Sequence, residues 1–245
     1  ATSLSYHLLG LNSAREPFTD ERVRQAISCA IDRQQIIDVA SLGEGQVTGP
    51  VTNPFFAVPD SDYACYTPDL EKAQALMAEA GYADGFAFTL ITPATEPAVG
   101  LADAQSIQSQ LKQIGIEVEI ELLELGIYVD RWLAGDMDAW VGRNSGAPDP
   151  DFMLYRYWHS TGNLNFVPGW NAPEVDALLE QGKQVTDPEE RKAIYAEAQK
   201  KLVEAAPWIW TYVFYEYRPM QDYVKGFTPM SDGSFIYLRD VWMDK

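Results

Sequence analysis

The sequence predicts an α/β fold in which a mixed, mostly parallel sheet is flanked by helices. Residues 86–92 and 116–123 have the pattern of strands, and between them apolar residues recur at helical spacing from Leu101 to Ile114. A strand, a helix and a strand with short joins form a βαβ unit, whose strands pair in parallel through a right-handed crossover. The 245 residues, 47% of them hydrophobic, are sufficient for one large core.

A strand and two helices are expected before this unit. Residues 4–12 are predicted to form the strand, and Thr19 and Asp20 are candidate N-caps for the first helix. A second helix is predicted over residues 32–40. Glycine and proline then recur through residues 42–67, which predicts a long surface loop.

Helices and strands continue to alternate along the middle of the chain. The next helix is expected to have Thr67 as its N-cap, Pro68 at its first position and Gly81 after its last turn. After the βαβ unit, the pattern predicts a helix over 126–134 and a strand over 137–143.

The loop at residues 144–150 (NSGAPDP) follows that strand, and ligands bind at strand ends in folds of this class. Asn171 and Asp187 each begin a capping-box pattern, so two helices are expected next. Residues 207–217 predict a strand covered on both faces, and residues 223–242 one or two short strands. Simple alternation would place four aromatic residues on one face of the former strand: Trp208, Trp210, Tyr212 and Phe214.

The charge balance argues against a nucleic-acid partner. Lys and Arg number 18 against 36 Asp and Glu, so the net charge of −18 would repel a phosphate backbone. No run of residues approaches the length of about 20 apolar residues that a membrane span needs. Residues 1–9 also lack the basic start and apolar core of a signal peptide.

The two cysteines match no metal-binding spacing. Cys29 lies in an apolar helical run and Cys65 in the long loop. A disulfide that pins the loop and two separate buried thiols are equal alternatives at this point.

Motifs for catalysis, metal binding or cofactor binding are missing, so we expect no enzyme, no metal and no cofactor. Only two histidines are present, and there is no GxSxG, HExxH or P-loop motif. Four acids could suggest an acid/base pair or a cation site, although solvated loop acids are expected in so acidic a chain: Asp136, Asp138, Asp149 and Asp151. Asp149 or Asp151 is kept as a candidate because each lies at a strand end, and Asp149 is included in the predicted ligand-binding set.

Arg143 at the exit of a predicted strand, beside Asn144 and Ser145, would supply fixed donors for a carboxylate or for hydroxyl groups. A structural ion pair is the alternative for this arginine. The aromatic run that contains Trp158 and precedes His159 could line an apolar pocket, with packing in the core as the alternative.

Several stretches resemble one family, the extracellular solute-binding proteins of the peptide/nickel class (family 5) that feed ABC importers. They follow one another in family order and cover nearly the whole chain. The matching segments are 8–36 (LLGLNSAREPFTDERVRQAISCAIDRQQI), 66–82 (YTPDLEKAQALMAEAGY), 149–152 (DPDF), 171–202 (NAPEVDALLEQGKQVTDPEERKAIYAEAQKKL) and 206–212 (APWIWTY).

This resemblance implies a periplasmic-binding-protein-like (type II) fold and a C-terminal fragment, because family members are roughly twice this length. Residues 1–221 would form the large ligand-binding lobe, and residues 222–245 would be strands that return to the other lobe. The implied role is capture of a small solute or short peptide for ABC permease subunits in the membrane. The implied place is the periplasm or cell exterior, with the signal peptide and N-terminal half outside this chain, and a monomer is expected.

One position departs from the family pattern. Peptide binders commonly carry an Asp four positions before the Pro of the DPD-like motif, and Gly146 stands there. Loss of this anion disfavours ordinary peptides, so a sugar-like, opine-like or carboxylate-bearing solute is an equal expectation. Trp140 completes the predicted ligand-binding set with Arg143, Asn144 and Ser145. Two other classes stay open: a carbohydrate-active hydrolase with paired Asp residues, and a stand-alone sensor or interaction module.

Overall fold

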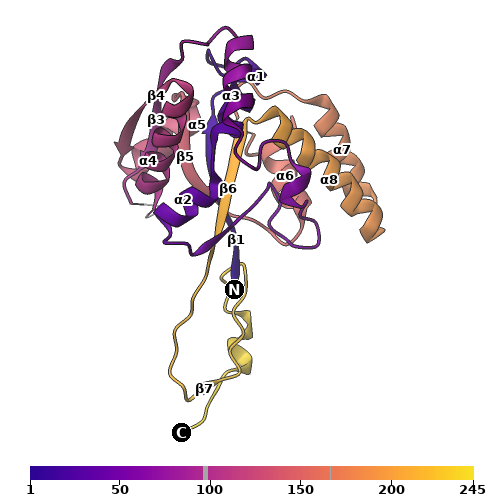
Figure 1. Cartoon of the computed structure of the whole chain (residues 1–245). Coiled ribbons are helices and arrows are strands. Elements are labelled where there is room, and N and C mark those ends of the chain that lie inside the picture. The colour runs from indigo at the N-terminus through magenta and orange to yellow at the C-terminus, as the bar shows by residue number, and fades with distance from the viewer. Residues whose placement is uncertain (96–98, 166) are drawn as a thin grey trace.

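The computed structural model describes residues 1–95, 99–165 and 167–245. A six-stranded sheet lies between two layers of helices, with the strand order β2-β6-β1-β5-β3-β4 (Figure 1). The sheet strands are β1 (Thr2–Leu11), β2 (Gly45–Val47), β3 (Phe86–Pro93), β4 (Ile116–Leu123), β5 (Ala139–Asn144) and β6 (Trp208–Tyr215). The α-helices are α1 (Glu21–Ala30), α2 (Arg33–Ala40), α3 (Leu70–Glu79), α4 (Gly100–Leu111), α5 (Leu125–Ala134), α6 (Pro150–Trp158), α7 (Pro173–Gln184) and α8 (Pro188–Ala205). Short 3-10 helices are η1 (Asp60–Asp62), η2 (Lys112–Ile114) and η3 (Ile236–Asp240).

The predicted mixed α/β sheet is confirmed. Strand β3 pairs in parallel with β4 and with β5, and α4 makes the crossover between β3 and β4. Strand β1 is antiparallel to β5 and to β6, and β2 is antiparallel to β6. Strands β3, β4, β5 and β6 therefore run in one direction, and β1 and β2 run in the other.

Each face of the sheet has its own hydrophobic core. On one face, α1 to α4 pack against the sheet through residues such as Ile27 and Ile107. On the other face, buried residues of α5 to α8, such as Leu154 and Leu202, surround the indoles of Trp208 and Trp210. Two helical layers around a twisted sheet are the expected way to bury both faces of parallel strands.

Two of the predicted helix caps are confirmed and two are wrong. The carboxylates of Asp20 and Asp187 accept hydrogen bonds from backbone N–H groups in the first turns of α1 and α8, and Asp32, which was not predicted as a cap, does the same in α2. Thr67 does not cap α3, because the Asp69 carboxylate accepts from the Lys72 N–H and the helix starts at Leu70. Asn171 does not cap α7 either, since the cap residue is Ala172 with no side-chain hydrogen bond.

The prediction that four aromatic residues share one face of β6 is wrong. Tyr6 pairs with Val213 whereas Leu8 pairs with Trp210, so two residues on β1 oppose three on β6. This bulge inverts the alternation. Trp208 and Trp210 lie in one core, and Tyr212 and Phe214 belong to the other.

Cys29 and Cys65 form a disulfide, which resolves the two alternatives. The bond joins α1 to the long loop that precedes α3. Arg33, which is only 1% exposed, supports the same loop by donating to the carbonyl oxygens of Cys65 (2.9 Å) and Trp210 (2.9 Å). Its guanidinium also lies 4.0 Å from the centroid of the Tyr66 ring.

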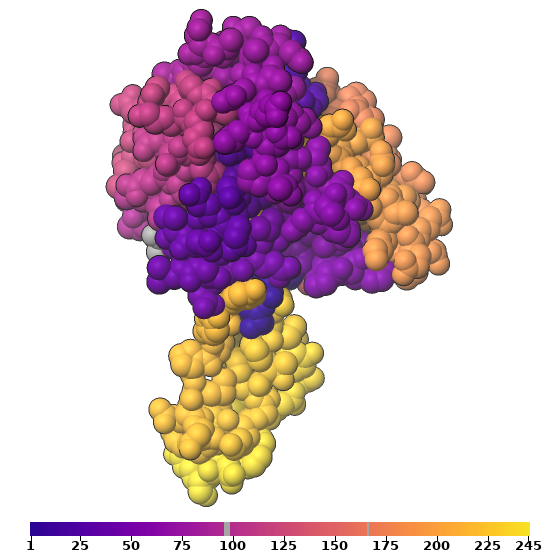
Figure 2. Space-filling model, viewed as in Figure 1, coloured from indigo at the N-terminus to yellow at the C-terminus, as the bar shows by residue number. Residues whose placement is uncertain are grey.

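Residues 216–245 leave the body of the molecule as a projecting tail (Figures 1 and 2). It contains the short antiparallel pair β7 (Val224–Lys225) and β8 (Trp242–Met243), as the sequence predicted. The tail is tied to β1 where the Leu4 N–H donates to the Ser231 carbonyl oxygen at 2.8 Å. Among the described residues, no helix combines the length and the hydropathy that a membrane crossing requires.

Replacing both cysteines, as in Cys29→Ala with Cys65→Ala, should lower the free energy of unfolding by about 2–4 kcal/mol, because the disulfide closes a long loop in the unfolded chain. Urea unfolding with and without reductant measures this effect. Reductant should destabilise the unmodified protein by a similar amount and leave the double variant unchanged. A double variant as stable as the parent would contradict a stabilising role for the bond.

Candidate functional site

One edge of the sheet gathers the features expected of a ligand site. The carboxyl ends of β3, β4, β5 and β6 meet there with the amino end of β1, because β1 runs opposite to these four strands. The loop at residues 144–150 leaves β5 at this edge, and the tail also projects from it (Figure 1). Ligands of open α/β sheets bind outside the carboxyl ends of their strands.

A cavity of about 210 Å³ opens beside β5 and α5 at this edge, and we call it the aromatic cavity. The rings of Trp132 and Trp140 meet edge to face at 5.8 Å between centroids. The Tyr128 hydroxyl donates to the carbonyl oxygen of Val141 at 3.1 Å, which fixes the Tyr128 ring beside these two indoles. The aromatic cavity is lined by Leu125, Tyr128, Val129, Trp132, Trp140, Gly142, Arg143 and Asn144.

Three predicted ligand residues, Trp140, Arg143 and Asn144, therefore lie at one cavity. Trp140 is 4% exposed and contributes part of the wall, whereas Arg143 is exposed at the strand exit. The guanidinium carbon of Arg143 lies 5.9 Å from the centroid of the Phe214 ring. Ser145 follows them as an exposed residue of the loop. The sequence did not predict Tyr128 and Trp132, although their spacing of four residues on α5 places them on one helix face.

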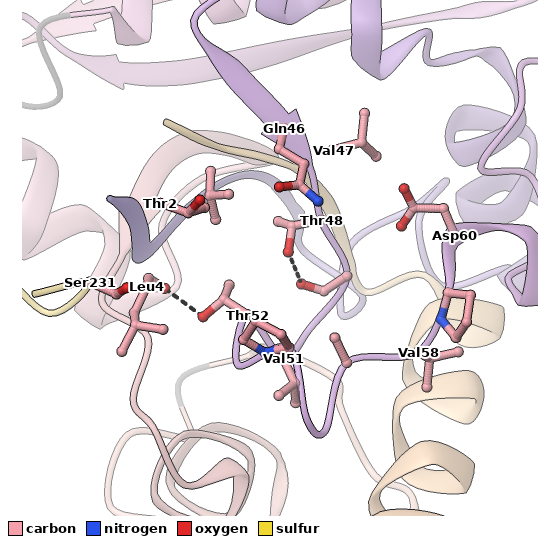
Figure 3. A pocket seen from close by; sticks show the side chains of 15 residues that line it. Thr2, Leu4, Gln46, Val47, Thr48, Val51, Thr52, Val58, Asp60 and Ser231 are labelled. Atoms are coloured by element: carbon pink, nitrogen blue, oxygen red, sulfur yellow. Dashed lines mark hydrogen bonds between the residues drawn. The ribbon is translucent and has the colours of Figure 1, made fainter. Parts of the chain in front are cut away.

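A second cavity, of about 360 Å³, lies beside β2 and the amino end of β1, and we call it the hydroxyl cavity (Figure 3). Thr2, Leu4 and Ser231 line one side of it, and Asp60 lies on the opposite side. Partial burial raises the pKa of the Asp60 carboxyl, and the positive charge of Arg33 opposes that shift. The remaining lining residues are Gln46, Val47, Thr48, Gly49, Val51, Thr52, Pro54, Ala57, Val58, Pro59 and Val213.

Gly146, in the loop after β5, lies at a point of close approach to β1. A Cβ atom at this position would lie 1.9 Å from the Leu4 carbonyl oxygen and 2.7 Å from the Thr52 hydroxyl oxygen. Thr52 donates to the same Leu4 oxygen at 2.9 Å, so the contact is fixed from two sides. The loop can therefore lie this close to β1 only with glycine at this position.

Asp149, a predicted ligand residue, is engaged in the fold instead. Its carboxylate caps α6 by accepting from the Asp151 N–H, and it accepts two hydrogen bonds from Arg191, both at 2.8 Å. This bidentate pair holds the pKa of Asp149 below its usual value. The Arg191 side chain also donates to the Gly182 carbonyl oxygen, so it joins α6, α7 and α8. The sequence did not predict α6 or this arginine's role.

Trp158 and His159 do not reach the strand-end edge, because they lie at the far end of α6 and pack inward. Trp158 is 1% exposed and its ring lies 4.7 Å from that of Trp208. His159 Nδ1 accepts from the Thr161 N–H at 3.1 Å, and its Nε2 faces Glu180 at 3.3 Å. Of the two alternatives for this aromatic run, the structure places these residues in the core. Within the described part of the chain, no group of three or more His, Cys, Asp or Glu side chains is arranged so that it could hold a metal ion.

The change Gly146→Ala should lower the free energy of unfolding by about 1–3 kcal/mol, because the added methyl group would overlap the Leu4 carbonyl. The neighbouring change Ser145→Ala, at an exposed position, is the matched control and should stay within about 0.5 kcal/mol. Chemical denaturation of both variants tests the contact. Equal stability of the two variants would show that the loop does not need this approach.

The change Arg191→Gln should lower the free energy of unfolding by about 1 kcal/mol at neutral pH. The folded-state pKa of Asp149 is lowered, so the ion pair stabilises the fold above the usual pKa of Asp. That contribution is lost as the pH falls through the lowered value, and the two proteins should then converge. Urea unfolding across a pH series measures it. In the Asp149→Asn background the Arg191 change should cost less, and an equal cost at every pH would contradict the ion-pair account.

Comparison with known proteins gives consistent results. Residues 1–165 match the family described as bacterial extracellular solute-binding proteins, family 5 Middle. A dipeptide-binding protein of Pseudomonas aeruginosa is 33% identical over 236 residues, covering 93% of this chain and 44% of that protein. The chain thus spans about half the length of the relatives it matches.

Two solved structures extend this similarity to the fold. The oligopeptide-binding protein AppA from Bacillus subtilis, in complex with a nonapeptide, aligns with a TM-score of 0.82 and 27% identity, over all of this chain and 52% of that one. AgaA from A. tumefaciens R10, in complex with agropinic acid, aligns with a TM-score of 0.78 and 27% identity over the same shares. The family comprises binding proteins rather than enzymes. The chain belongs to the bacterial extracellular solute-binding proteins of family 5.

Proposed function

We propose that this chain forms a ligand-binding lobe that captures a small solute, peptide-like or opine-like, for delivery to an ABC importer in the membrane. The observation that carries the proposal is the aromatic cavity at the strand-end edge, where Trp132 and Trp140 meet polar groups of Arg143 and Asn144. Aromatic walls with a few polar groups are typical of small-molecule sites. Family membership supports the same role.

The two parts of the chain are assigned to two lobes on the basis of the same strand-end edge. Residues 1–221 would form the lobe that holds the solute, and residues 222–245 would return to a second lobe. The tail supports this because it projects from the edge where both cavities lie and exposes apolar residues. Those residues include Phe235 (56% exposed), Ile236 (63%) and Trp242 (55%). The expected place of action is the periplasm or cell exterior.

The ligands of two similar structures bear on the class of solute. AppA was solved with a nonapeptide and AgaA with agropinic acid, so neighbours at the same identity hold both kinds of ligand. Glycine at position 146 supports the opine-like alternative, because no anion stands there to meet a peptide amine. The hydrolase alternative has no support at Asp149, whose carboxylate is held ionised by Arg191.

A panel of dipeptides, oligopeptides and opines, titrated calorimetrically into the complete protein, tests the proposal. The change Trp132→Ala should weaken binding of any member that binds by about tenfold or more, because truncation removes a wall of the cavity. Leu133→Ala is the matched control, since Leu133 is the next residue of α5, 45% exposed and outside the cavity. Absence of binding across the panel, or equal affinities in both variants, would contradict the proposal.

A further inference from the structure

We infer that the hydroxyl cavity binds a primary ammonium group on an aliphatic stem, with the Asp60 carboxylate as its counter-ion. The inference rests on the proposed function in taking this group to be part of the captured solute, and it narrows the solute to one that carries an amine. None of the preceding arguments gave this cavity a ligand. The anion it supplies stands apart from position 146, where the chain has glycine.

The hydroxyl cavity has the size and the walls of a small-molecule site. Its volume of about 360 Å³ is within the range of such sites. Aliphatic side chains, among them Leu4, Val51 and Val58, form part of the wall. The Asp60 side chain points from its own loop toward this space, on the side opposite Leu4 (Figure 3). The cavity thus combines an apolar surface for a stem with one carboxylate.

The charge in the cavity is negative. Asp60 is the one charged residue among those that the structure describes in the lining. The charge that acts on it is that of Arg33, whose N–H groups are engaged by the carbonyl oxygens of Trp210 and Cys65. Partial burial raises the pKa of Asp60 by penalising the charged form, and a bound cation would offset that penalty. The carboxylate is therefore available to pair with a cation from outside.

The hydroxyl groups that are fixed in the cavity present acceptors. The Thr48 hydroxyl donates to the Gly49 carbonyl oxygen at 3.3 Å, and the Thr52 hydroxyl donates to the Leu4 carbonyl oxygen at 2.9 Å. Each hydroxyl has a single proton, so both oxygens offer a ligand only their lone pairs. An ammonium group has three donors and no acceptor, which matches these oxygens and the carboxylate. Three further side chains of the lining can both donate and accept, so they fit the same group: Thr2, Gln46 and Ser231.

The hydroxyl cavity borders the loop at residues 144–150, where we expect the solute. Leu4 and Thr52 line the cavity, and the same two residues lie against Gly146 of that loop. The side-chain amide of Asn53 donates to the carbonyl oxygen of Pro148, so a second contact holds the cavity wall to the loop. One aliphatic arm of a solute at the strand-end edge can thus enter the cavity and place its ammonium group beside Asp60.

Butylammonium, titrated into the complete protein at constant ionic strength against sodium, is the probe. The methyl resonances of Thr48 and Thr52, in protein with ¹³C-labelled threonine methyl groups, report binding and are assigned with Thr48→Ser and Thr52→Ser. They should shift in a saturable manner. 1-Butanol is similar in size and uncharged, so it should bind more weakly by about tenfold or more, because it cannot pair with the carboxylate.

Asp60→Asn keeps the side-chain shape and removes the charge, so it should weaken the apparent butylammonium affinity by about tenfold or more. This variant should fold, because no hydrogen bond contributes to the pKa shift of the carboxyl. Asp62→Asn is the matched control. Asp62 lies outside the cavity lining and forms a surface ion pair with Lys200 at 3.7 Å. Its replacement removes the same charge from the chain and should leave the affinity unchanged.

Shifts that do not saturate, equal affinities for butylammonium and 1-butanol, or equal affinities in Asp60→Asn and Asp62→Asn would each overturn the inference. The comparison with 1-butanol needs no variant and the titration needs no natural solute. Failure of the peptide and opine panel with saturable butylammonium binding would count against the proposed function alone. Binding of a panel member without butylammonium binding would count against the ammonium site alone.

Discussion

The central position of β1 is the constraint on which the rest of the structure depends. This strand pairs with β5 on one side and β6 on the other, so the first and the last sheet strands of the chain lie next to each other. Both of its faces are buried, which forces neighbours to approach its backbone closely. The Trp140 indole packs where a side chain on Gly10 would stand, and the loop after β5 packs on the Leu4 carbonyl. The wall of the aromatic cavity and the path of the ligand loop are thus both set by contacts to β1.

Three arginines of this acidic chain have clear structural roles. With 18 basic against 36 acidic residues, carboxylate partners are abundant, yet two buried arginines use none of them. Arg24 donates to the carbonyl oxygens of Ala205 and Phe18, and Arg33 binds carbonyl oxygens around the disulfide. Arg191 instead pairs with Asp149 and orders the helix that follows the ligand loop.

Local sequence signals predicted the fold better than they predicted the site. The βαβ unit and the caps at Asp20 and Asp187 follow from periodicity and short-range hydrogen bonds, which operate within a few residues. The bulge in β6 escaped prediction because it depends on the register of β1, a partner about 200 residues away. Arg191 escaped for the same reason, since its partner Asp149 lies 42 positions away. Arg143 and Asn144 lie where the sequence predicted, at the carboxyl end of β5, and Trp140 of the same strand lines the same cavity. Their role in ligand binding stays a prediction.

The glycine at position 146 connects the fold to selectivity. A carboxylate side chain there would need its Cβ where the Leu4 carbonyl oxygen now lies, so an anion at this position and the present loop path exclude each other. The proposed preference for an opine-like solute over a peptide rests on this exclusion. Because the Leu4 carbonyl belongs to the central strand, the exclusion is built into the sheet itself and cannot be reversed by a side-chain rotation.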